Sequence, residues 1–234
     1  DADTAALFPD RLVDSELGPI PEGWEVTPLR KHITSQKGLS YKGKGLRESG
    51  MHLHNLNSVL EGGGYKYAGI KYYEGDHKDR HLVRSGDLLV TNTEQGHECL
   101  LLGFPAIIPN QYQEMGLFSH HLFKVTPTGE SPLTRLFLYH WLCHPRHHHR
   151  VSSFGNGTTV NMLPKDALEL PTVLTPSADL VARFTDMAQQ YQDQGDCNVS
   201  ESRTLAELRD LLLPKLLSGE IRVKEAEKMV EDAV

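Results

Sequence analysis

The chain has 234 residues, of which 38% are hydrophobic and 7% are aromatic. This composition supports one hydrophobic core and excludes a disordered chain, a collagen-like fibre and a membrane-embedded protein, because no apolar run approaches the roughly 20 residues that a spanning helix needs. The formal net charge of −7 argues against a uniformly basic nucleic-acid binder, so the distribution of charge along the chain matters more than its sum.

The cysteines indicate the cellular compartment, and the first residue bears on whether the chain was processed. Cys99, Cys143 and Cys197 lie far apart, and no CxxC spacing is present. A sparse, odd count is typical of a reducing cytoplasm and disfavours a structural zinc site, so we expect a cytoplasmic protein. No signal peptide is visible, and a chain that starts at Asp1 rather than Met is expected to be trimmed or cut from a longer one.

The first part of the chain is predicted to be a loop that leads into a strand. Residues 1–23 end in glycines and prolines, which punctuate loops. The folded part then begins at Trp24, where WEVTPLRKHI (24–33) predicts a strand that turns into a short helix. Thr27 suits the N-cap of that helix and Pro28 suits its first position.

The central region, 36–130, is predicted to be mostly β-structure. Short segments with alternating or β-branched residues recur between glycines, at the spacing expected of a barrel or a sandwich. This region also overlaps the basic part of the chain, since 30–84 contains 11 Lys and Arg against 5 Asp and Glu, a net of +6. An ordinary solvated face and a polyanion-binding face are both compatible with this excess.

The next elements are a helix, a loop and an edge strand. Residues 132–149 predict a helix whose apolar face includes Leu136 and Trp141 and which Pro145 stops. The segment 153–163 reads as a glycine-rich loop. ALELPTVLTP (167–176) is typical of an edge strand closed by prolines.

From Ser177 a heptad pattern predicts a helix over 177–217, followed by a tail at 218–234. The middle of the pattern is polar, and Gly195 weakens a helix by roughly 1 kcal/mol relative to alanine. One long helix and two helices broken near 195–198 are therefore both allowed, and a plain surface helix is the alternative to a pairing helix. The segment 177–234 is acidic, with 7 Lys and Arg against 12 Asp and Glu. The seam expected to pair with a second helix comprises Leu180, Phe184, Met187, Tyr191, Asn198, Leu205, Leu208 and Leu212.

No catalytic motif is found in the sequence. No GxGxxG follows a predicted strand, GKGLRES lacks the Gly-Lys-Ser/Thr ending of a phosphate loop, and the Asn-Pro-Pro-aromatic tetrad of amino-methylating enzymes is missing. Asp87 and Glu94 suggest a nuclease carboxylate pair, but Gln95, Gly96 and His97 stand where a lysine would have to follow. We expect no catalytic residues and no cofactor.

The 13 histidines raise the question of a metal site. His52 and His54 share one face of a predicted strand, whereas 120–121 and 147–149 are adjacent runs that converge on one ion only if the backbone folds around it. The run 147–149 is expected just past a helix end, where cationic groups suit the helix dipole. We therefore expect solvated loop histidines and no metal site, with a histidine-metal hydrolase as the alternative.

Three polar clusters are candidates for contacts with DNA. The first is a basic, glycine-spaced loop at 37–47, where Lys and Arg neutralise phosphates and an aromatic ring packs on sugar or stacks. The second follows a strand end at 92–95 and the third lies in a loop at 157–161; amide side chains bond adenine edges and threonine meets the thymine methyl. Solvated turns are the alternative for each cluster. The candidates are Lys37, Tyr41, Lys42, Lys44, Arg47, Asn92, Thr93, Gln95, Thr158, Thr159 and Asn161.

The order of four stretches resembles the specificity subunits of type I restriction-modification systems. LGPIPEGWEVTPLRKH (17–32) resembles the opening of a target-recognition domain, and SGDLLVTNTEQG (85–96) resembles its Gly-Asp-hydrophobic strand and loop. GNGTTVNMLPKDALELPTVLTP (155–176) fits the link to a helix, and LAELRDLLLPKLLSGEIRV (205–223) fits the end of a conserved spacer helix. The resemblance covers nearly the whole chain, and its specificity lies in the order and spacing of the stretches.

The resemblance implies an α+β (α/β) fold, with a β-rich target-recognition domain at 17–176 and a long helix at 177–217 that pairs as an antiparallel coiled coil. It implies a non-catalytic subunit that reads one half of a bipartite target in double-stranded DNA. The implied partners are the modification (methyltransferase) subunits and the restriction subunits, and no membrane is expected. The alternative is a coiled-coil assembly module without sequence-specific DNA binding.

The chain departs from the family plan, in which one subunit carries two recognition domains and two spacer helices. It has one of each, and residues 1–16 look like the lead-in segment of a second recognition domain. We therefore expect either the C-terminal half of a cut-down subunit or a natural half-subunit. Such a half-subunit forms a homodimer or pairs with another half-subunit through its helix.

Overall fold

The computed structural model describes residues 2–96, 98, 100–157 and 159–231. The chain divides into two compact units, 1–188 and 189–234, and each is described by itself. The long helix α5 (Ala178–Ser218) runs through the boundary between them. Its first turns belong to the first unit, because Val181 and Ala188 are buried in the core of that unit.

The centre of the first unit is a four-stranded antiparallel sheet. Its strand order is β11-β9-β13-β4, and Leu88 pairs with both Ile107 and Val125. All four residues of the central strand β9 are buried, which explains the continuous apolar run in the sequence. The strands are β4 (Ile33–Lys37), β9 (Leu88–Thr91), β11 (Pro105–Ile107) and β13 (Leu122–Pro127).

A second, five-stranded sheet has the order β5-β7-β6-β12-β8. β12 runs parallel to β6, and the other neighbours are antiparallel. With the first sheet it confirms the prediction that 36–130 is mostly β-structure. The strands are β5 (Leu46–Arg47), β6 (Met51–His54), β7 (Lys71–Tyr73), β8 (Leu82–Val83) and β12 (Gly116–Phe118), with the short 3-10 helices η2 (Gly43–Gly45), η3 (Leu56–Ser58) and η4 (Asp79–His81) in the connections.

Strand β9 separates two cores because its side chains alternate between the two faces of the sheet. Leu88 and Val90 face a core that the helices cover, whereas Leu89 faces a core shared with the second sheet. A buried imidazole borders the second core, where His54 Nδ1 lies 2.8 Å from the Tyr65 hydroxyl oxygen. Burial lowers the pKa of His54 from 6.5 to about 3.

Three two-stranded pairs complete the first unit. β3 pairs with β15 and brings the start of the domain next to the segment that leads into α5. The 3-10 helix η1 (Leu29–Lys31) follows β3, but Thr27 does not cap it; the Thr27 hydroxyl lies 2.6 Å from His32 Nε2 instead, and Pro28 holds the N-cap position. The expected cap is therefore wrong. The pairs are β1 (Leu12–Val13) with β2 (Ile20–Pro21), β3 (Glu25–Pro28) with β15 (Thr172–Thr175), and β10 (Thr93–Gln95) with β14 (Val160–Met162).

The helical segment after the sheets is two helices rather than one. α2 (Arg135–Cys143) begins at the N-cap Thr134, whose hydroxyl accepts the Phe137 N–H at 3.2 Å. Pro145 does end α2, but it also occupies the first position of α3 (Pro145–Ser152). His144 is extended between them, because the residue before proline avoids the helical region. The expected single helix over 132–149 is therefore wrong, and the run 147–149 lies inside α3 rather than past a helix end.

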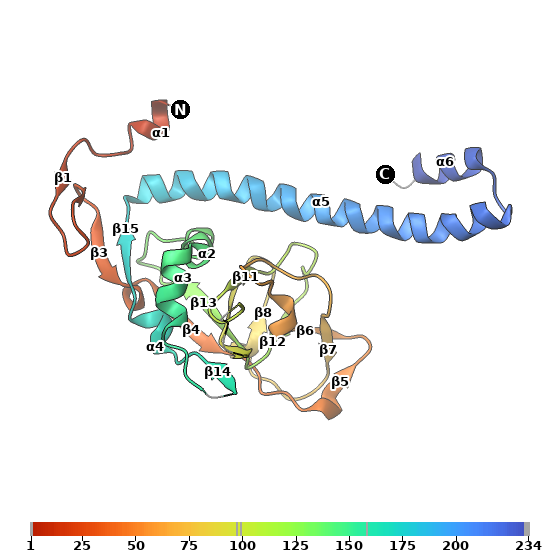
Figure 1. Ribbon diagram of the computed structural model, residues 1–234, viewed down its shortest axis with the longest axis horizontal. Coiled ribbons are helices and arrows are strands. Elements are labelled where there is room, and N and C mark those ends of the chain that lie inside the picture. The colour runs from red at the N-terminus through yellow and green to blue at the C-terminus, as the bar shows by residue number, and fades with distance from the viewer. Residues whose placement is uncertain (1, 97, 99, 158, 232–234) are drawn as a thin grey trace. The chain divides into compact units, whose positions relative to one another are not determined.

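The helices cover one face of the four-stranded sheet, as Figure 1 shows for α2 and α3 beside β13 and β4. The core between them contains Trp141, Val151 and Leu168 together with Leu88 and Val90 of the sheet. Leu168 lies in α4 (Asp166–Glu169), which overlaps the start of the predicted edge-strand segment 167–176. The remaining helix of the first unit, α1 (Ala2–Ala5), lies at the N-terminus.

The second unit is a helical hairpin. α5 is continuous through Gly195, so of the two alternatives the structure has one long helix. It ends at Ser218, and the next residue, Gly219, has a φ of +73°, which suits a glycine. The Glu220 N–H donates back to the Lys215 carbonyl at 3.0 Å. α6 (Val223–Glu231) follows and buries Ala226. The predicted tail, 218–234, thus contains a helix. The mixed α+β fold with a long C-terminal helix is confirmed.

Candidate nucleic-acid interface

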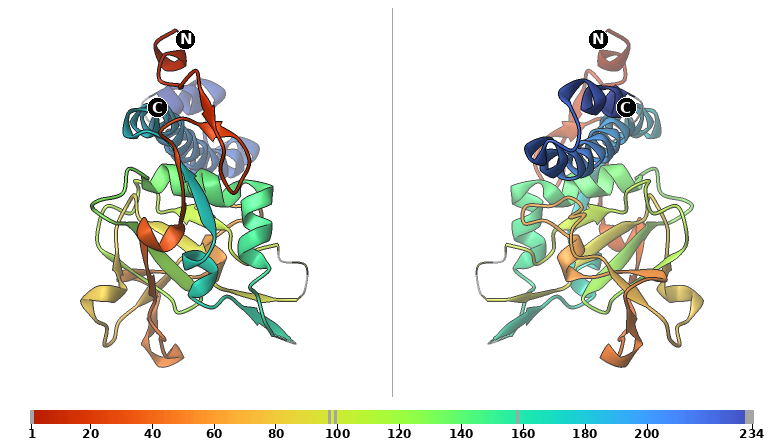
Figure 2. Two further views of the ribbon diagram at one scale, coloured as in Figure 1. Left: turned by 90° about the vertical axis from the view of Figure 1, so that its left-hand side faces the viewer. Right: turned by 90° about the vertical axis from the view of Figure 1, so that its right-hand side faces the viewer.

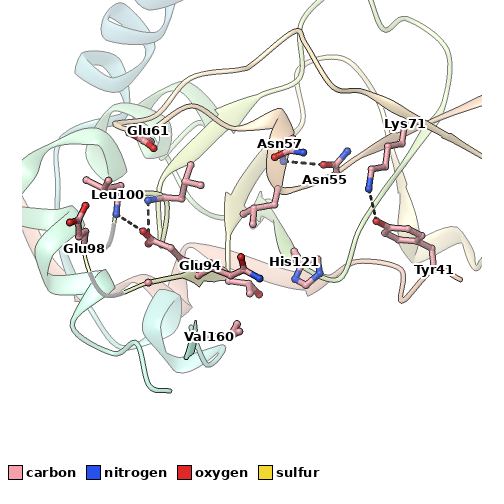
Figure 3. Close-up of a pocket in the computed structure, with 15 residues that line it drawn as sticks. Tyr41, Asn55, Asn57, Glu61, Lys71, Glu94, Glu98, Leu100, His121 and Val160 are labelled. Atoms are coloured by element: carbon pink, nitrogen blue, oxygen red, sulfur yellow. Dashed lines mark hydrogen bonds between the residues drawn. The ribbon is translucent and has the colours of Figure 1, made fainter. Parts of the chain in front are cut away.

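One pocket of the first unit is lined by three of the predicted contact residues, Tyr41, Thr93 and Gln95, and by further polar side chains. It has a volume of about 800 Å³ and lies between the segment 41–61 and the loop that follows β10 (Figure 3). Strand β14, which pairs with β10, and strand β5 both lie on the side of the unit away from α2 (Figures 1 and 2). The lining residues are Tyr41, 55–57, Glu61, Lys71, 93–96, Glu98, Leu100, Leu101, His121 and Val160.

The basic loop at 37–47 is held by contacts of its own. Arg47 donates from Nε to Glu74 Oε2 at 3.0 Å and from Nη1 to the carbonyl oxygens of Lys44 and Leu46 at 2.8 and 2.9 Å. Its guanidinium therefore shapes the loop. Lys42 and Lys44 are exposed around η2, and Lys37 is exposed at the end of β4. The structure thus leaves three of the four predicted cations pointing to solvent.

Tyr41 lies in the pocket beside a lysine that the sequence analysis did not select. Lys71 Nζ donates to the Tyr41 hydroxyl at 3.0 Å and lies 5.5 Å from the centre of the Tyr41 ring (Figure 3). Tyr41 also packs edge-on against Tyr73, with 6.1 Å between the ring centroids. The pairing of β7 with β5 and β6 places Lys71 beside Tyr41. In the sequence, only the strand-like segment 67–73 pointed to this lysine.

His120 and His121 form part of the same surface, although the sequence predicted only solvated loop histidines there. Their ring centroids lie 3.9 Å apart, and both rings are half-buried. Burial lowers the pKa of His121, and the nearby His120, Lys37 and Lys71 lower it further because like charges disfavour the imidazolium. The structure therefore adds a histidine pair to the predicted lysines.

Asn92 and Thr93 are not exposed to a ligand in this conformation. Asn92 is fully buried; its Nδ2 donates to the His120 carbonyl at 3.1 Å and its backbone N–H donates to the His121 carbonyl at 2.9 Å. The Thr93 hydroxyl donates to Asn92 Oδ1 at 2.8 Å. The predicted base-reading amide therefore holds the turn that carries the histidine pair.

Of the remaining predicted contacts, Gln95 lies on β10, Asn161 lies on β14, and Thr159 directly precedes β14. Gln95 and Thr159 are exposed, whereas Asn161 is buried and donates to the Gly96 carbonyl at 2.6 Å. Asn161 therefore ties the two strands together. Thr158 lies outside the described residues. Only Gln95 and Thr159 of this group present side chains to solvent.

Glu94 fixes the loop that closes this side of the pocket. Its carboxylate is buried and accepts the backbone N–H groups of Leu100, Leu101 and Leu102 at 2.8, 3.2 and 2.9 Å (Figure 3). Asp87, the other acid of the suspected nuclease pair, accepts the Arg84 N–H at 3.0 Å and lies 3.4 Å from Arg135 Nη2. Both carboxylates thus have structural partners.

The predicted pairing seam of α5 divides into exposed and covered positions. Within the first unit, Phe184 and Met187 are 37% and 45% exposed, and both line an apolar pocket of about 250 Å³ with Leu180, Phe8 and Trp24. Leu180 itself is buried. Within the second unit, Tyr191, Asn198 and Leu205 are exposed, Leu208 is half-buried, and Leu212 is buried and lines a pocket between α5 and α6.

Two further searches concern metals and membranes. Among the described residues, no three His, Cys, Asp or Glu side chains gather in a way that could hold a metal ion. In the same part of the chain, every helix is too short or too polar to span a bilayer.

No protein-family model and no curated protein matches the sequence. Eleven chains of solved structures match the fold, among them the three that follow. The type I restriction-modification S subunit from M. genitalium has 14% identity and a TM-score of 0.60, with 84% of this chain and 46% of that chain covered. The HsdS subunit from Thermoanaerobacter tengcongensis has 15% identity and a TM-score of 0.51, with 94% and 50% covered.

The third structure concerns the assembly and conformational transition of the type I R-M system. It has 18% identity and a TM-score of 0.53, with 90% of this chain and 47% of that chain covered. The chain thus spans about half the length of the structures that it matches. It therefore has the fold of the specificity subunits of type I restriction-modification systems.

Proposed function

We propose that the chain is a non-catalytic DNA-reading component of a type I restriction-modification complex. It reads one half of a bipartite target and scaffolds the methyltransferase and restriction subunits. The observation that carries the proposal is the pocket lined by Tyr41, Lys71 and His121 on a domain with the fold of a specificity subunit. The pocket lies beside a loop whose Lys42 and Lys44 are exposed.

The chemistry of this surface suits a duplex because it offers both kinds of contact that sequence reading requires. Lys37, Lys42 and Lys44 supply cations for phosphates, which set position without reading sequence. Gln95, exposed on β10, and Thr159, exposed directly before β14, supply side chains for base edges. Buried Asn92 and Asn161 keep the carriers of these groups in place.

The charge on the basic loop provides the first test. We expect the double variant Lys42→Ala, Lys44→Ala to weaken binding to all duplexes alike and to lower the slope of log K against log salt by up to about 1.8, since each phosphate contact contributes about 0.9. The slope is measured by fluorescence anisotropy with the modification subunit present. Lys31→Ala, an exposed lysine outside the loop at 37–47, is the control. An unchanged slope in the double variant removes the loop from the interface.

Sequence reading itself is tested by competition. Duplexes of equal length, bipartite and random in sequence, compete for the complex with the modification subunit. They are drawn from a library that is large enough to contain the unknown target. Enrichment of one half-site supports the proposal. Equal recovery of all sequences contradicts DNA reading and favours an assembly module that recruits partners through its helix.

Helix pairing is the second part of the proposal. Phe184, Met187 and Tyr191 step along one face of α5 and are exposed by 37%, 45% and 77%. Apolar residues at this spacing stabilise a helix pair. The occupant of this seam is a second copy of the chain or another half-subunit, which supplies the second spacer helix that the family plan requires.

We expect Met187→Glu with Tyr191→Glu to abolish self-association, because two charges would be buried in the seam. Sedimentation at micromolar concentration should shift from a dimer to the 26.2 kDa monomer. Ala182→Glu, on a different and exposed face of α5, should leave the dimer intact. A wild-type chain that is monomeric alone and in mixtures with a second half-subunit would contradict pairing.

A further inference from the structure

The turn at 119–122 presents the His121 imidazole to the pocket, and the His120 ring packs against it. The Leu122 N–H donates to the Ser119 carbonyl at 3.0 Å and closes the turn. The two ring nitrogens His120 Nδ1 and His121 Nδ1 are buried and have no hydrogen-bond partner. Asn92 holds both carbonyls of the pair, so the backbone beneath the imidazoles is fixed while the rings keep open valences.

The groups that face this pair from other elements are mainly cationic. Lys37 on β4 and Lys71 on β7 both act on the His121 ring, and His120 contacts it from the same turn. Glu94 on β10 also lines the pocket, but its carboxylate accepts three backbone N–H groups. Tyr41 lies between the histidines and Lys71, with 6.5 Å between its ring centroid and that of His120.

We propose that His120 and His121, together with Lys37 and Lys71, form a phosphodiester site that takes up a proton when nucleic acid binds. The inference rests on the proposed DNA-reading function and adds a regulation of that surface. In the free chain, burial and the neighbouring cations keep the pKa of His121 below its ordinary value, so the imidazole is neutral near pH 7. A phosphate placed among these groups supplies the missing negative charge and stabilises the imidazolium, which then donates to a phosphate oxygen.

The sign of the effect follows from linkage. Because the bound state holds the proton more tightly than the free state, binding strengthens as the pH falls through the pKa of the bound form. It levels off below the pKa of the free form. Uptake of one proton gives at most a tenfold gain in affinity per pH unit within that window. A site made of lysines alone would show no such dependence between pH 6 and 8.

The test compares four forms of the full chain, with the modification subunit present and duplex DNA as the probe at constant ionic strength. Wild type should bind several-fold more tightly at pH 6 than at pH 8. His121→Gln, which cannot be protonated, should lose most of this dependence. His121→Arg carries a permanent charge and should bind more tightly than wild type at pH 8 while showing a flat profile. His149→Gln, on the exposed part of α3, should behave as wild type.

A second readout counts the proton directly. Calorimetric titration in two buffers of different ionisation enthalpy should show proton uptake at pH 7 in wild type and less uptake in His121→Gln. If duplex binds but the pH profile and proton uptake are the same in wild type and His121→Gln, the proton-linked site is wrong while DNA reading stands. If no duplex binds at any pH, the proposed function and this inference both fail.

Discussion

Replacing Glu94 by alanine is expected to lower the free energy of unfolding by about 3–5 kcal/mol, since a hydrogen bond to a charged group contributes about 1.5–3 kcal/mol and buried donors left unpaired add a penalty. The carboxylate accepts three consecutive backbone N–H groups at 100–102, and Leu102 is fully buried in the core.

Urea unfolding with a matched acid separates this role from a general effect of charge. Glu98→Ala removes an exposed carboxylate of the same pocket and should change stability by less than about 0.5 kcal/mol. Glu94→Gln should fall between the two, because its amide keeps one acceptor oxygen but turns a donor toward the other N–H groups. Equal stability of Glu94→Ala and Glu98→Ala would show that the loop does not depend on the buried carboxylate.

His54 is expected to make the first unit sensitive to acid. Its imidazole is neutral in the folded state because burial lowers its pKa to about 3, whereas the unfolded chain has the ordinary value of 6.5. The unfolded state therefore binds more protons between these values, and stability that is complete above pH 6.5 is lost as the pH falls toward 3. Between pH 7 and 4.5 the loss from this group amounts to about 3 kcal/mol, since each pH unit below 6.5 contributes roughly 1.4 kcal/mol.

The variant His54→Asn tests this linkage. An asparagine amide can reach the position of Nδ1 and keep the hydrogen bond to the Tyr65 hydroxyl, but it does not titrate. The variant should be less stable at pH 7 through lost packing against Tyr112, whose ring centroid lies 5.1 Å from that of His54. Its unfolding free energy should nevertheless fall less steeply toward pH 4.5 than that of wild type. His149→Asn, at an exposed position, should retain the wild-type slope.

Local patterns sufficed for the elements whose neighbours in space are also near in sequence. The heptads predicted α5 within a residue at each end, and alternation predicted the β-rich region. The segment 132–149 was predicted to be a single helix, whereas the structure has two. The same proline, Pro145, ends α2 and begins α3. Proline at a first helical turn and proline after a helix look alike when read singly.

The candidate site depended on long-range pairing, which a single sequence does not reveal. Lys71 reaches Tyr41 from β7, and Asn92 reaches the carbonyl of His120 from the end of β9. The residue type of Asn92 suggested base contacts, but the side chain is buried and donates to the backbone carbonyl of His120 instead. The exposed lysines at 42 and 44 and Gln95 stay predictions for DNA contact, as does the helix seam for pairing.

The hydrogen bonds of Asn92 also bear on how such a surface can acquire a new preference. Asn92 and Asn161 both donate to backbone carbonyls within the domain. These hydrogen bonds do not involve the side chains that face outward. Under the proposed function, substituting the exposed Gln95 or Thr159 would change the groups available to a base edge. It would not unfold the strands that carry these side chains. Substitutions are therefore expected to be tolerated at the exposed positions 95 and 159. They are expected to destabilise the domain at the buried Asn92 and Asn161, two or three positions away.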